Sequence, residues 1–225
     1  MSINVVEKID ELVKIQHVLV SVSDKRGLDT FIPQLVDLNP QIKIFSTGGT
    51  FSAIGEILGE TATRVLSQVS DYTGQPETQG GLVKTLDFKI YLGLLTETYN
   101  DSHQDDLKRT DSVAIDMVVG NLYPFKETIS KPDVTVEQAR GNIDIGGPCM
   151  IRASAKNFIR VASVVDPGDY ETIVSELKKN SGAISLDLRF RLAQKAFDHT
   201  AVYDRTIADF LASKSPADVK GCYSI

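Results

Sequence analysis

Two consecutive segments of the chain follow the same order of strand, polar loop and helix, and this order constrains the fold most. In the first, the β-branched run HVLVSVSD (residues 17–24) precedes the helical pattern GLDTFIPQLVDL (residues 27–38). In the second, the apolar run IKIF (residues 42–45) leads through the loop STGGT into a further helical pattern. Strand–loop–helix units in tandem favour a parallel sheet whose loops gather at the carboxyl ends of the strands. We expect ligands to bind at that edge.

Further apolar runs extend this α/β pattern to about residue 180. We predict strands within KIYLGLL (residues 89–95), AIDMVVGNLY (residues 114–123) and RVASVVD (residues 160–166), with helical segments between them. Between residues 185 and 212, apolar side chains recur at intervals of three and four, which predicts one long helix or two shorter ones. The predicted fold is therefore an α/β parallel sheet flanked by helices, with a helical C-terminal extension.

The two ends of the chain carry separate patterns. Residues 5–15 (VVEKIDELVKI) place apolar side chains at helical spacing, which predicts a short amphipathic helix inside an N-terminal extension over residues 1–16. We expect the main domain to span residues 17–211 as one unit. Residues 212–225 are expected to form a loosely ordered tail.

Charge and cysteine content narrow the classes of function. A net charge of −6, with both signs dispersed along 225 residues, argues against binding to a nucleic-acid backbone, although one cluster of donors can still hold a small anion. Cys149 and Cys222 fit neither a disulfide framework nor a zinc-binding spacing. No apolar stretch approaches the ~20 residues that cross a bilayer, and no signal-like segment opens the chain. We expect a cytoplasmic protein that binds neither nucleic acid nor membranes.

Two polar loops at predicted strand ends carry the parts of a phosphate site. The STGGT loop combines hydroxyls and glycines with a helix start, whose free N–H groups attract anions. It lacks the closing GK[ST] of a Walker A loop and the GxGxxG dinucleotide fingerprint. Ser21, Ser23 and Lys25 of SVSDK would add two hydroxyls and a cation at the same edge. The alternative for STGGT is a plain turn, and the alternative for SVSDK is a helix cap with a solvated lysine. Each alternative has about the same weight as a phosphate site.

Two further motifs supply candidate reacting groups. Lys84 and Thr85 follow the glycine pair of GGLVKT, where a desolvated lysine can supply both charge and a proton. A surface charge is the more common role for such a lysine. NLYPF presents Asn121 and Tyr123 at a strand end, and Pro124 biases Tyr123 toward an extended backbone. The alternative there is a tyrosine packed at a strand-to-loop corner.

The stretch NIDIGGPCMIRASAKN (residues 142–157) places a carboxylate before two glycines and a proline. Pro148 is suited to the first turn of a helix, whose N-terminal amides and dipole would then lie beside Asp144. Arg152 and Lys156, four residues apart, would share one helix face. We expect Asp144 to pair with Lys156 or Lys84. The alternative is a capped helix with a solvated basic stripe.

These motifs, in the order SVSDK, STGGT, SDYTG, GG.VKTL, NLYPF, NIDIGG, RASAKN, VVDPGDY and KAFDHTAVYD, closely resemble one enzyme family. It is the inosine monophosphate (IMP) cyclohydrolase half of the bifunctional purine-biosynthesis protein that also carries aminoimidazole-carboxamide ribotide formyltransferase. The resemblance runs from about His17 to Leu211. It implies a methylglyoxal-synthase-like domain with a Rossmann-type parallel sheet, and a homodimer.

The resemblance also implies a reaction and two groups of residues. The carboxamide nitrogen of 5-formamidoimidazole-4-carboxamide ribotide would attack the formyl carbon, and water would leave to give IMP, without a metal or cofactor. The catalytic group would be Lys84, Tyr123, Asp144 and Lys156. The substrate-binding group would be Ser21, Ser23, Lys25, Ser46, Thr47, Gly48, Gly49, Thr50, Thr85, Asn121, Ile145, Gly146 and Gly147.

Within the catalytic group, each member has an expected role. Lys84 and the N–H groups of residues 145–147 would stabilise the oxyanion on the formyl oxygen. Lys156, oriented by Asp144, would move protons, and Tyr123 would hydrogen-bond the reacting groups.

The sequence departs from the family pattern at two places. The family reads GGRVKTLHP where this chain reads GGLVKTLDF, so Leu82 replaces an arginine and Asp87-Phe88 replaces His-Pro. The family's GILAR is GLLTE here, which removes a second cation that we expect near the same edge. A separate formyltransferase would supply the substrate if the chain acts alone.

Two other functions compete with the cyclohydrolase. A non-catalytic nucleotide-sensing domain would keep the fold and bind IMP without turnover, and Leu82 and Asp87 motivate this alternative. Methylglyoxal synthase chemistry on a triose phosphate would use the same fold. The motifs NLYPF and NIDIGG favour the cyclohydrolase.

Overall fold

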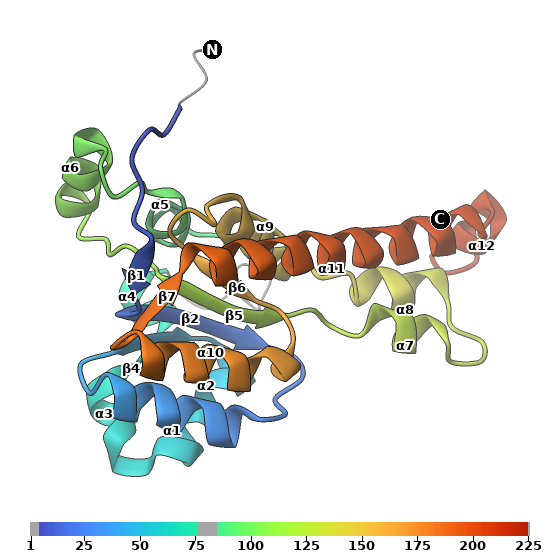
Figure 1. Cartoon of the computed structure of the whole chain (residues 1–225). Helices are drawn as coiled ribbons and strands as arrows, with labels where there is room; N and C mark the ends of the chain where they lie inside the picture. The colour runs from blue at the N-terminus through green and yellow to red at the C-terminus, as the bar shows by residue number, and fades with distance from the viewer. Residues whose placement is uncertain (1–4, 76–84, 225) are drawn as a thin grey trace.

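The computed structural model of the chain describes residues 5–75 and 85–224. At its centre lies a five-stranded sheet in the order β4-β3-β2-β5-β6, and all four pairs of neighbouring strands are parallel (Figure 1). The strands are β2 (His17–Val22), β3 (Lys43–Ser46), β4 (Leu66–Gln68), β5 (Met117–Asn121) and β6 (Ala162–Val164). The predicted α/β fold with a parallel sheet is confirmed.

The sheet buries apolar side chains on both faces, as parallel sheets covered by helices do. In β2, Val18 and Val20 belong to the core on one face, and Leu19 belongs to the core on the other. The first face is covered by α1 (Leu28–Leu38), α2 (Gly48–Leu58) and α10 (Tyr170–Lys179). The second is covered by α4 (Val69–Thr73), α5 (Phe88–Leu95) and α9 (Gly146–Lys156).

A long helix, α11 (Leu186–Ala212), runs past the sheet and out of the domain (Figure 1). Its C-terminal half, together with α7 (Phe125–Ile129), α8 (Val136–Gly141) and α12 (Pro216–Lys220), forms an arm that projects from the sheet. A third apolar cluster, which includes Phe125 and Phe210, fills the arm and continues under α9. The remaining elements are β1 (Leu12–Lys14), η1 (Gly59–Thr61), α3 (Ala62–Val65), α6 (Asp101–Arg109), η3 (Pro167–Asp169) and β7 (Ala183–Ser185).

The predicted N-terminal helix over residues 5–15 is wrong. Leu12–Lys14 instead forms β1, which pairs antiparallel with β7 in a separate two-stranded sheet. The carbonyl oxygens of Asp10 and Glu11, which a helix would use internally, accept hydrogen bonds from the buried guanidinium of Arg189 at 2.7 and 3.3 Å. Tertiary partners for the backbone therefore outweigh the helical spacing of the apolar residues.

The strand predicted within residues 89–95 is also wrong, because these residues form α5. Asp87 caps the helix by accepting a hydrogen bond from the Lys89 N–H at 2.7 Å. Ile90, Gly93 and Leu94 then share the buried face at helical spacing. A short apolar run cannot be assigned to strand or helix from its periodicity alone.

The C-terminal region is more regular than predicted. Residues 186–212 form one helix of 27 residues, so the prediction of a single long helix is the correct one of the two. The expected loose tail contains α12, which begins with a capping box between Ser215 and Asp218 and has Pro216 at its first position.

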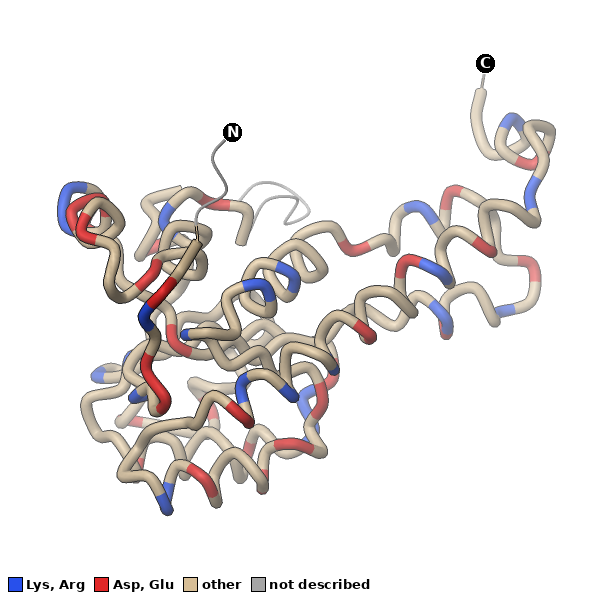
Figure 2. The backbone as a smooth tube through the Cα atoms, turned by 45° about the horizontal axis from the view of Figure 1, so that its top comes forward, with Lys and Arg blue, Asp and Glu red and all other residues tan. Residues whose placement is uncertain are grey.

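None of the helices in the described part of the chain is long and apolar enough to cross a membrane. Lysine, arginine, aspartate and glutamate residues are interspersed along the backbone (Figure 2).

Candidate functional site

The carboxyl ends of β2, β3 and β5 bring the predicted binding loops together. The parallel register places Ser21 opposite Gly120 and Val20 opposite Ser46. The hydroxyl oxygens of Ser21 and Thr47 consequently lie 3.4 Å apart. The loops SVSDK and STGGT therefore converge at one edge of the sheet, as the strand–loop–helix order predicts.

Within the STGGT loop, two hydroxyls have structural partners. The Ser46 hydroxyl donates to the carbonyl oxygen of Val20 at 2.7 Å, and Ser46 is fully buried. The Thr50 hydroxyl donates to the carbonyl of Val22 at 3.0 Å and accepts from its N–H at 3.2 Å. Ser46 and Thr50, which we predicted to bind the phosphate, instead use their hydroxyls to hydrogen-bond the backbone of β2. They therefore hold the two loops together.

The more accessible part of the STGGT loop is the start of α2, at Gly48 and Gly49. Gly48 is the first residue of the helix and has a positive φ of 48°, a conformation that glycine adopts without strain. A Cβ atom added to Gly49 would meet no atom within 4 Å. The backbone at these two glycines can therefore be approached closely by an anion at a helix N-terminus.

Asn121 acts as a clamp on the neighbouring loop. Its side-chain oxygen accepts hydrogen bonds from the N–H groups of Ser23 and Asp24 at 2.7 and 2.8 Å, and its amide nitrogen donates to the Asp24 carbonyl at 2.9 Å. These three bonds use the side chain that we expected to contact substrate. They position Ser23, which is half-buried, and Lys25, which is exposed.

Asp144 is fixed at both its backbone and its side chain. One carboxylate oxygen accepts a hydrogen bond from the Gly147 N–H at 3.0 Å, and the Asp144 N–H donates to the Tyr203 hydroxyl at 2.7 Å. Burial raises the pKa of Asp144 above the ordinary value for an aspartate, although hydrogen bonds from the backbone N–H groups of Gly147, Tyr123 and Gly146 oppose this shift. Two of the three amides that we expected to stabilise an oxyanion, those of Gly146 and Gly147, are thus directed at Asp144.

The surroundings of Asp144 are partly open. Tyr123 and Ile145 each expose 60% of their surface. Ile145 follows Asp144 in the sequence, and the backbone N–H of Tyr123 hydrogen-bonds the carboxylate. Thr85 is buried, and its hydroxyl oxygen lies 3.1 Å from the position that a Cβ on Gly146 would occupy. Lys84 and Leu82 lie outside the described residues.

Lys156 does not join this cluster. Lys156 is the last residue of α9, and Asp144 lies two residues before Gly146, the first residue of the helix. The length of the helix therefore separates Asp144 from Lys156 by about 15 Å. An extended lysine side chain spans less than half of that length. The neighbouring Asn157 donates to the carbonyl oxygens of Leu94 and Thr96 at the other end of α5. A direct pair between Asp144 and Lys156 in one protomer is therefore wrong.

Arg152 has a packing partner of its own. Its guanidinium lies 5.6 Å from the centre of the Phe197 ring on α11, a cation–π distance. The basic face of α9 is thus turned partly toward α11.

Two of the departures from the family pattern also have structural explanations. Asp87 is buried and caps α5, so it serves the helix start. Thr96 and Glu97 lie past the end of α5, where the Thr96 carbonyl binds Asn157 and Arg160. Thr96 and Glu97 are therefore distant from the carboxyl edge of the sheet. We had expected the family's arginine, which Glu97 replaces, to lie near that edge.

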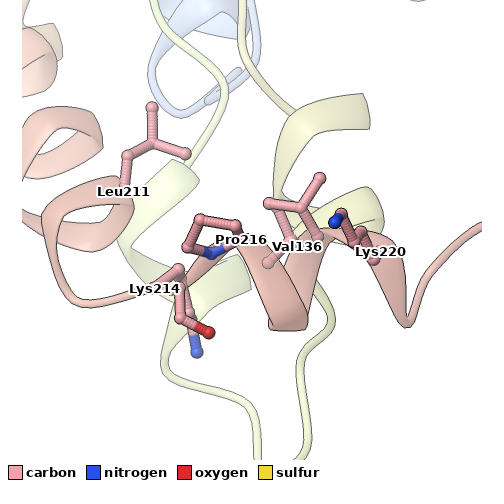
Figure 3. Close-up of a pocket in the computed structure, with 7 residues that line it drawn as sticks. Val136, Leu211, Lys214, Pro216 and Lys220 are labelled. Carbon is pink, nitrogen blue, oxygen red and sulfur yellow. The ribbon is translucent and has the colours of Figure 1, made fainter.

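A cavity in the arm lies away from the candidate site. Figure 3 shows this cavity at the junction of α8, α11 and α12. It is lined by Val136, Leu211, Lys214, Ser215, Pro216, Val219 and Lys220. Among the residues that the structure describes, no group of histidine, cysteine and acidic side chains is arranged to hold a metal ion.

Sequence reasoning missed Tyr203 as part of the site. The residue lies within KAFDHTAVYD, which the resemblance includes, but it is 59 residues from Asp144 and no local spacing connects the two. Only the packing of α11 against the loop before α9 brings them together.

Two family models together match most of the chain. One, described as MGS-like domain, matches residues 27–149, and the other, described as AICARFT/IMPCHase bienzyme, matches residues 154–224. The crystal structure of ForH aligns with a TM-score of 0.73 and 28% identity, covering 88% of this chain and 99% of that chain.

Curated relatives are bifunctional purine biosynthesis proteins named PurH. The protein from Thermoanaerobacter sp. (strain X514) is 49% identical over 197 residues, and the one from Acidithiobacillus ferrooxidans is 44% identical over 203 residues. These alignments cover 88% and 90% of this chain but 37% and 38% of the relatives. The chain thus spans well under half the length of the relatives it matches. It belongs to the MGS-like domain family, in the group formed by the IMP cyclohydrolase part of PurH.

Proposed function

We propose that this chain is an IMP cyclohydrolase that closes the purine ring of 5-formamidoimidazole-4-carboxamide ribotide. The observation that carries the proposal is Asp144, a half-buried carboxylate held at the carboxyl end of β5, the edge of the sheet at which two hydroxyl-bearing loops also meet. We infer the substrate from the similarity of the chain to the PurH proteins. The product is IMP, and the proposed place of the reaction is purine biosynthesis in the cytoplasm.

The reaction requires two proton transfers besides ring closure. The carboxamide nitrogen forms a bond to the formyl carbon and loses one proton, while the formyl oxygen gains one. The resulting hydroxyl then leaves as water with the proton of the former formamide nitrogen, and a carbon–nitrogen double bond remains. An amide nitrogen is a weak nucleophile, so positioning of the two groups contributes much of the acceleration.

Asp144 is suited to accept the proton from the carboxamide nitrogen. Burial raises its pKa, which makes the carboxylate a stronger base than a solvated aspartate, and hydrogen bonds from backbone N–H groups oppose part of this shift by stabilising the ionised form. The exposed phenol of Tyr123 is available to hydrogen-bond the reacting groups. In this proposal Lys84 provides the cation for the oxyanion, on the resemblance alone.

The 5′-phosphate is assigned to the opposite side of the site. Ser21, Thr47 and Ser23 supply hydroxyls, the backbone at Gly48 and Gly49 supplies a helix N-terminus, and Lys25 supplies charge. Ser46, Thr50 and Asn121 act indirectly, because their side chains hold these loops in place.

Lys156 enters the proposal only through a second copy of the chain. The length of α9 separates it from Asp144 of its own protomer, but the side chain is exposed and is accessible to a neighbour. The homodimer that the family resemblance implies would provide that neighbour. An enzyme that formylates the aminoimidazole-carboxamide ribotide must supply the substrate.

The test is to mix purified protein with the synthetic formamido substrate and to follow ring closure by ultraviolet absorbance. Asp144→Asn and Lys84→Ala are expected to lose turnover. Asp133→Asn is the matched control, because Asp133 is an exposed aspartate on the loop before α8. Equal rates for Asp144→Asn and Asp133→Asn would contradict the role of Asp144.

A nucleotide-binding domain without catalysis is the alternative, and Leu82 is the observation that favours it. A leucine cannot donate the hydrogen bonds of the family's arginine, each of which contributes about 1.5–3 kcal/mol when the partner is charged. Binding of IMP without any turnover of the formamido substrate would support this alternative.

A further inference from the structure

The residue that connects the C-terminal helix to the candidate site is Tyr203. Its hydroxyl accepts the hydrogen bond from the backbone N–H of Asp144 at 2.7 Å. The Asp144 carboxylate is bound separately by the Gly147 N–H. The backbone and the side chain of Asp144 are thus held by different parts of the protein, and both must be held to fix the direction of the carboxylate.

Tyr203 also contacts the second stretch that carries a candidate reacting group. Its ring packs edge-on against Phe125, with ring centres 6.2 Å apart, and Phe125 packs in the same way against Phe210 at 5.9 Å. The Phe125 N–H donates to the carbonyl oxygen of Tyr123 at 2.8 Å. One side chain on α11 therefore supports both the loop of Asp144 and the corner of Tyr123.

The surroundings of Tyr203 suit a fixed contact. The residue is only 8% exposed, within the apolar cluster that joins α7, α9 and α11. Burial raises the pKa of its hydroxyl, so the phenol stays neutral near pH 7. A tyrosine ring has few rotatable bonds, and packing within this cluster and against Phe125 leaves its oxygen little freedom.

We propose that Tyr203 is a positioning residue for the ring-closing reaction, acting by holding the backbone of Asp144 and the corner of Tyr123 in register. This inference rests on the proposed function. Tyr203 does not contact the reacting atoms itself, and its loss should affect the chemical step more than substrate binding, because the phosphate-binding loops lie on other elements.

The test compares Tyr203→Phe with Tyr72→Phe. Each substitution keeps an aromatic ring and removes a hydroxyl that accepts a backbone N–H: Asp144 in the first case, and Val113 at 2.9 Å in the second. Tyr72 likewise packs against a phenylalanine, Phe45, with ring centres 4.5 Å apart. Val113 lies four residues before β5, at the opposite end of that strand from the site. The two variants are therefore matched in chemistry and differ in location.

Three quantities are measured for both variants: kcat and KM on the formamido substrate, the melting temperature, and hydrogen exchange of the backbone amides over residues 142–147. We expect Tyr203→Phe to lower kcat by about 10- to 100-fold, with KM changed by less than about twofold. We expect both variants to lower the melting temperature by a similar few degrees. Only Tyr203→Phe should accelerate exchange at Asp144.

Equal kcat values for the two variants, with an active wild type, would overturn the inference and leave the proposed function standing. A wild type that does not turn over the substrate would instead overturn the proposed function. The exchange measurement then decides the positioning role alone: faster exchange at Asp144 in Tyr203→Phe supports it, and unchanged exchange overturns it.

Discussion

The carboxylate of Asp144 occupies the space that a side chain on Gly147 would need. A Cβ atom built on Gly147 would lie 2.4 Å from the Asp144 Oδ2 atom and 2.8 Å from a methyl group of Leu122. The Gly147 N–H meanwhile donates to the other carboxylate oxygen. The glycine therefore permits the close approach that holds Asp144 at the start of α9.

Replacing Gly147 by alanine should displace Asp144 without unfolding the domain. We expect kcat to fall by about 10- to 100-fold, because a displacement of about 1 Å can cost two orders of magnitude in rate. Steady-state kinetics and circular dichroism check this. Gly141→Ala, at the end of α8 with no atom within 4 Å of its Cβ position, should leave kcat unchanged. Comparable loss in both variants would contradict the prediction.

The raised pKa of Asp144 predicts how activity and stability depend on pH. If the ionised carboxylate is the base, kcat/KM should fall as the pH decreases, with a midpoint above that of a solvated aspartate. For stability the sign is opposite: a carboxyl whose pKa is raised on folding stabilises the protein when protonated, and this contribution is lost as the pH rises through the folded-state pKa. Asp144→Asn should therefore melt higher than the wild type at pH 7. Calorimetry and a carboxyl NMR titration measure both effects, and a depressed pKa would contradict them.

The clamp made by Asn121 should control substrate affinity. Asn121→Ala leaves the N–H groups of Ser23 and Asp24 without their acceptor, at a cost of about 1–3 kcal/mol for each group that remains buried. The loop should then loosen, and we expect KM to rise about tenfold with a smaller change in kcat. Asn100→Ala is the control, because Asn100 caps α6 far from this loop. A rise in KM in the control as well would show a general loss of stability.

The position of Lys156 predicts a result for mixed proteins. Asp144→Asn and Lys156→Ala are each expected to be inactive alone. If the two residues serve one substrate from different copies, mixing and re-equilibrating equal amounts should restore about one quarter of wild-type activity, because half of the dimers are mixed and each has one intact site. Activity that stays absent after exchange of protomers is confirmed would place both residues in one protomer and contradict the geometry of α9.

Much of the sheet could be predicted from the sequence because its local signals agree with the tertiary structure. The runs before SVSDK, STGGT and NLYPF are β2, β3 and β5, and their polar loops meet at the carboxyl edge. The GGP turn starts α9 with Pro148 in its first turn, as expected. In these segments the composition, the turn residues and the packing all favour the same structure.

The errors come from contacts that no local pattern contains. Residues 12–14 pair with β7, about 170 positions later, and Arg189 binds the carbonyls of Asp10 and Glu11. The expected pair of Asp144 and Lys156 failed for a different reason: the carboxylate and the lysine were both taken from one motif, but a helix of 11 residues lies between them. A motif shows which residues belong together and not how far apart the helix places them.

Helix α11 connects the sheet, the candidate site and the arm. Its 27 residues form a rod of about 40 Å that is anchored at one end by the Ser185 cap and by Arg189, and that carries the arm at the other. Tyr203 lies between these ends. The arm and the backbone of Asp144 are therefore connected through a single helix, by the hydrogen bond that Tyr203 accepts from the Asp144 N–H.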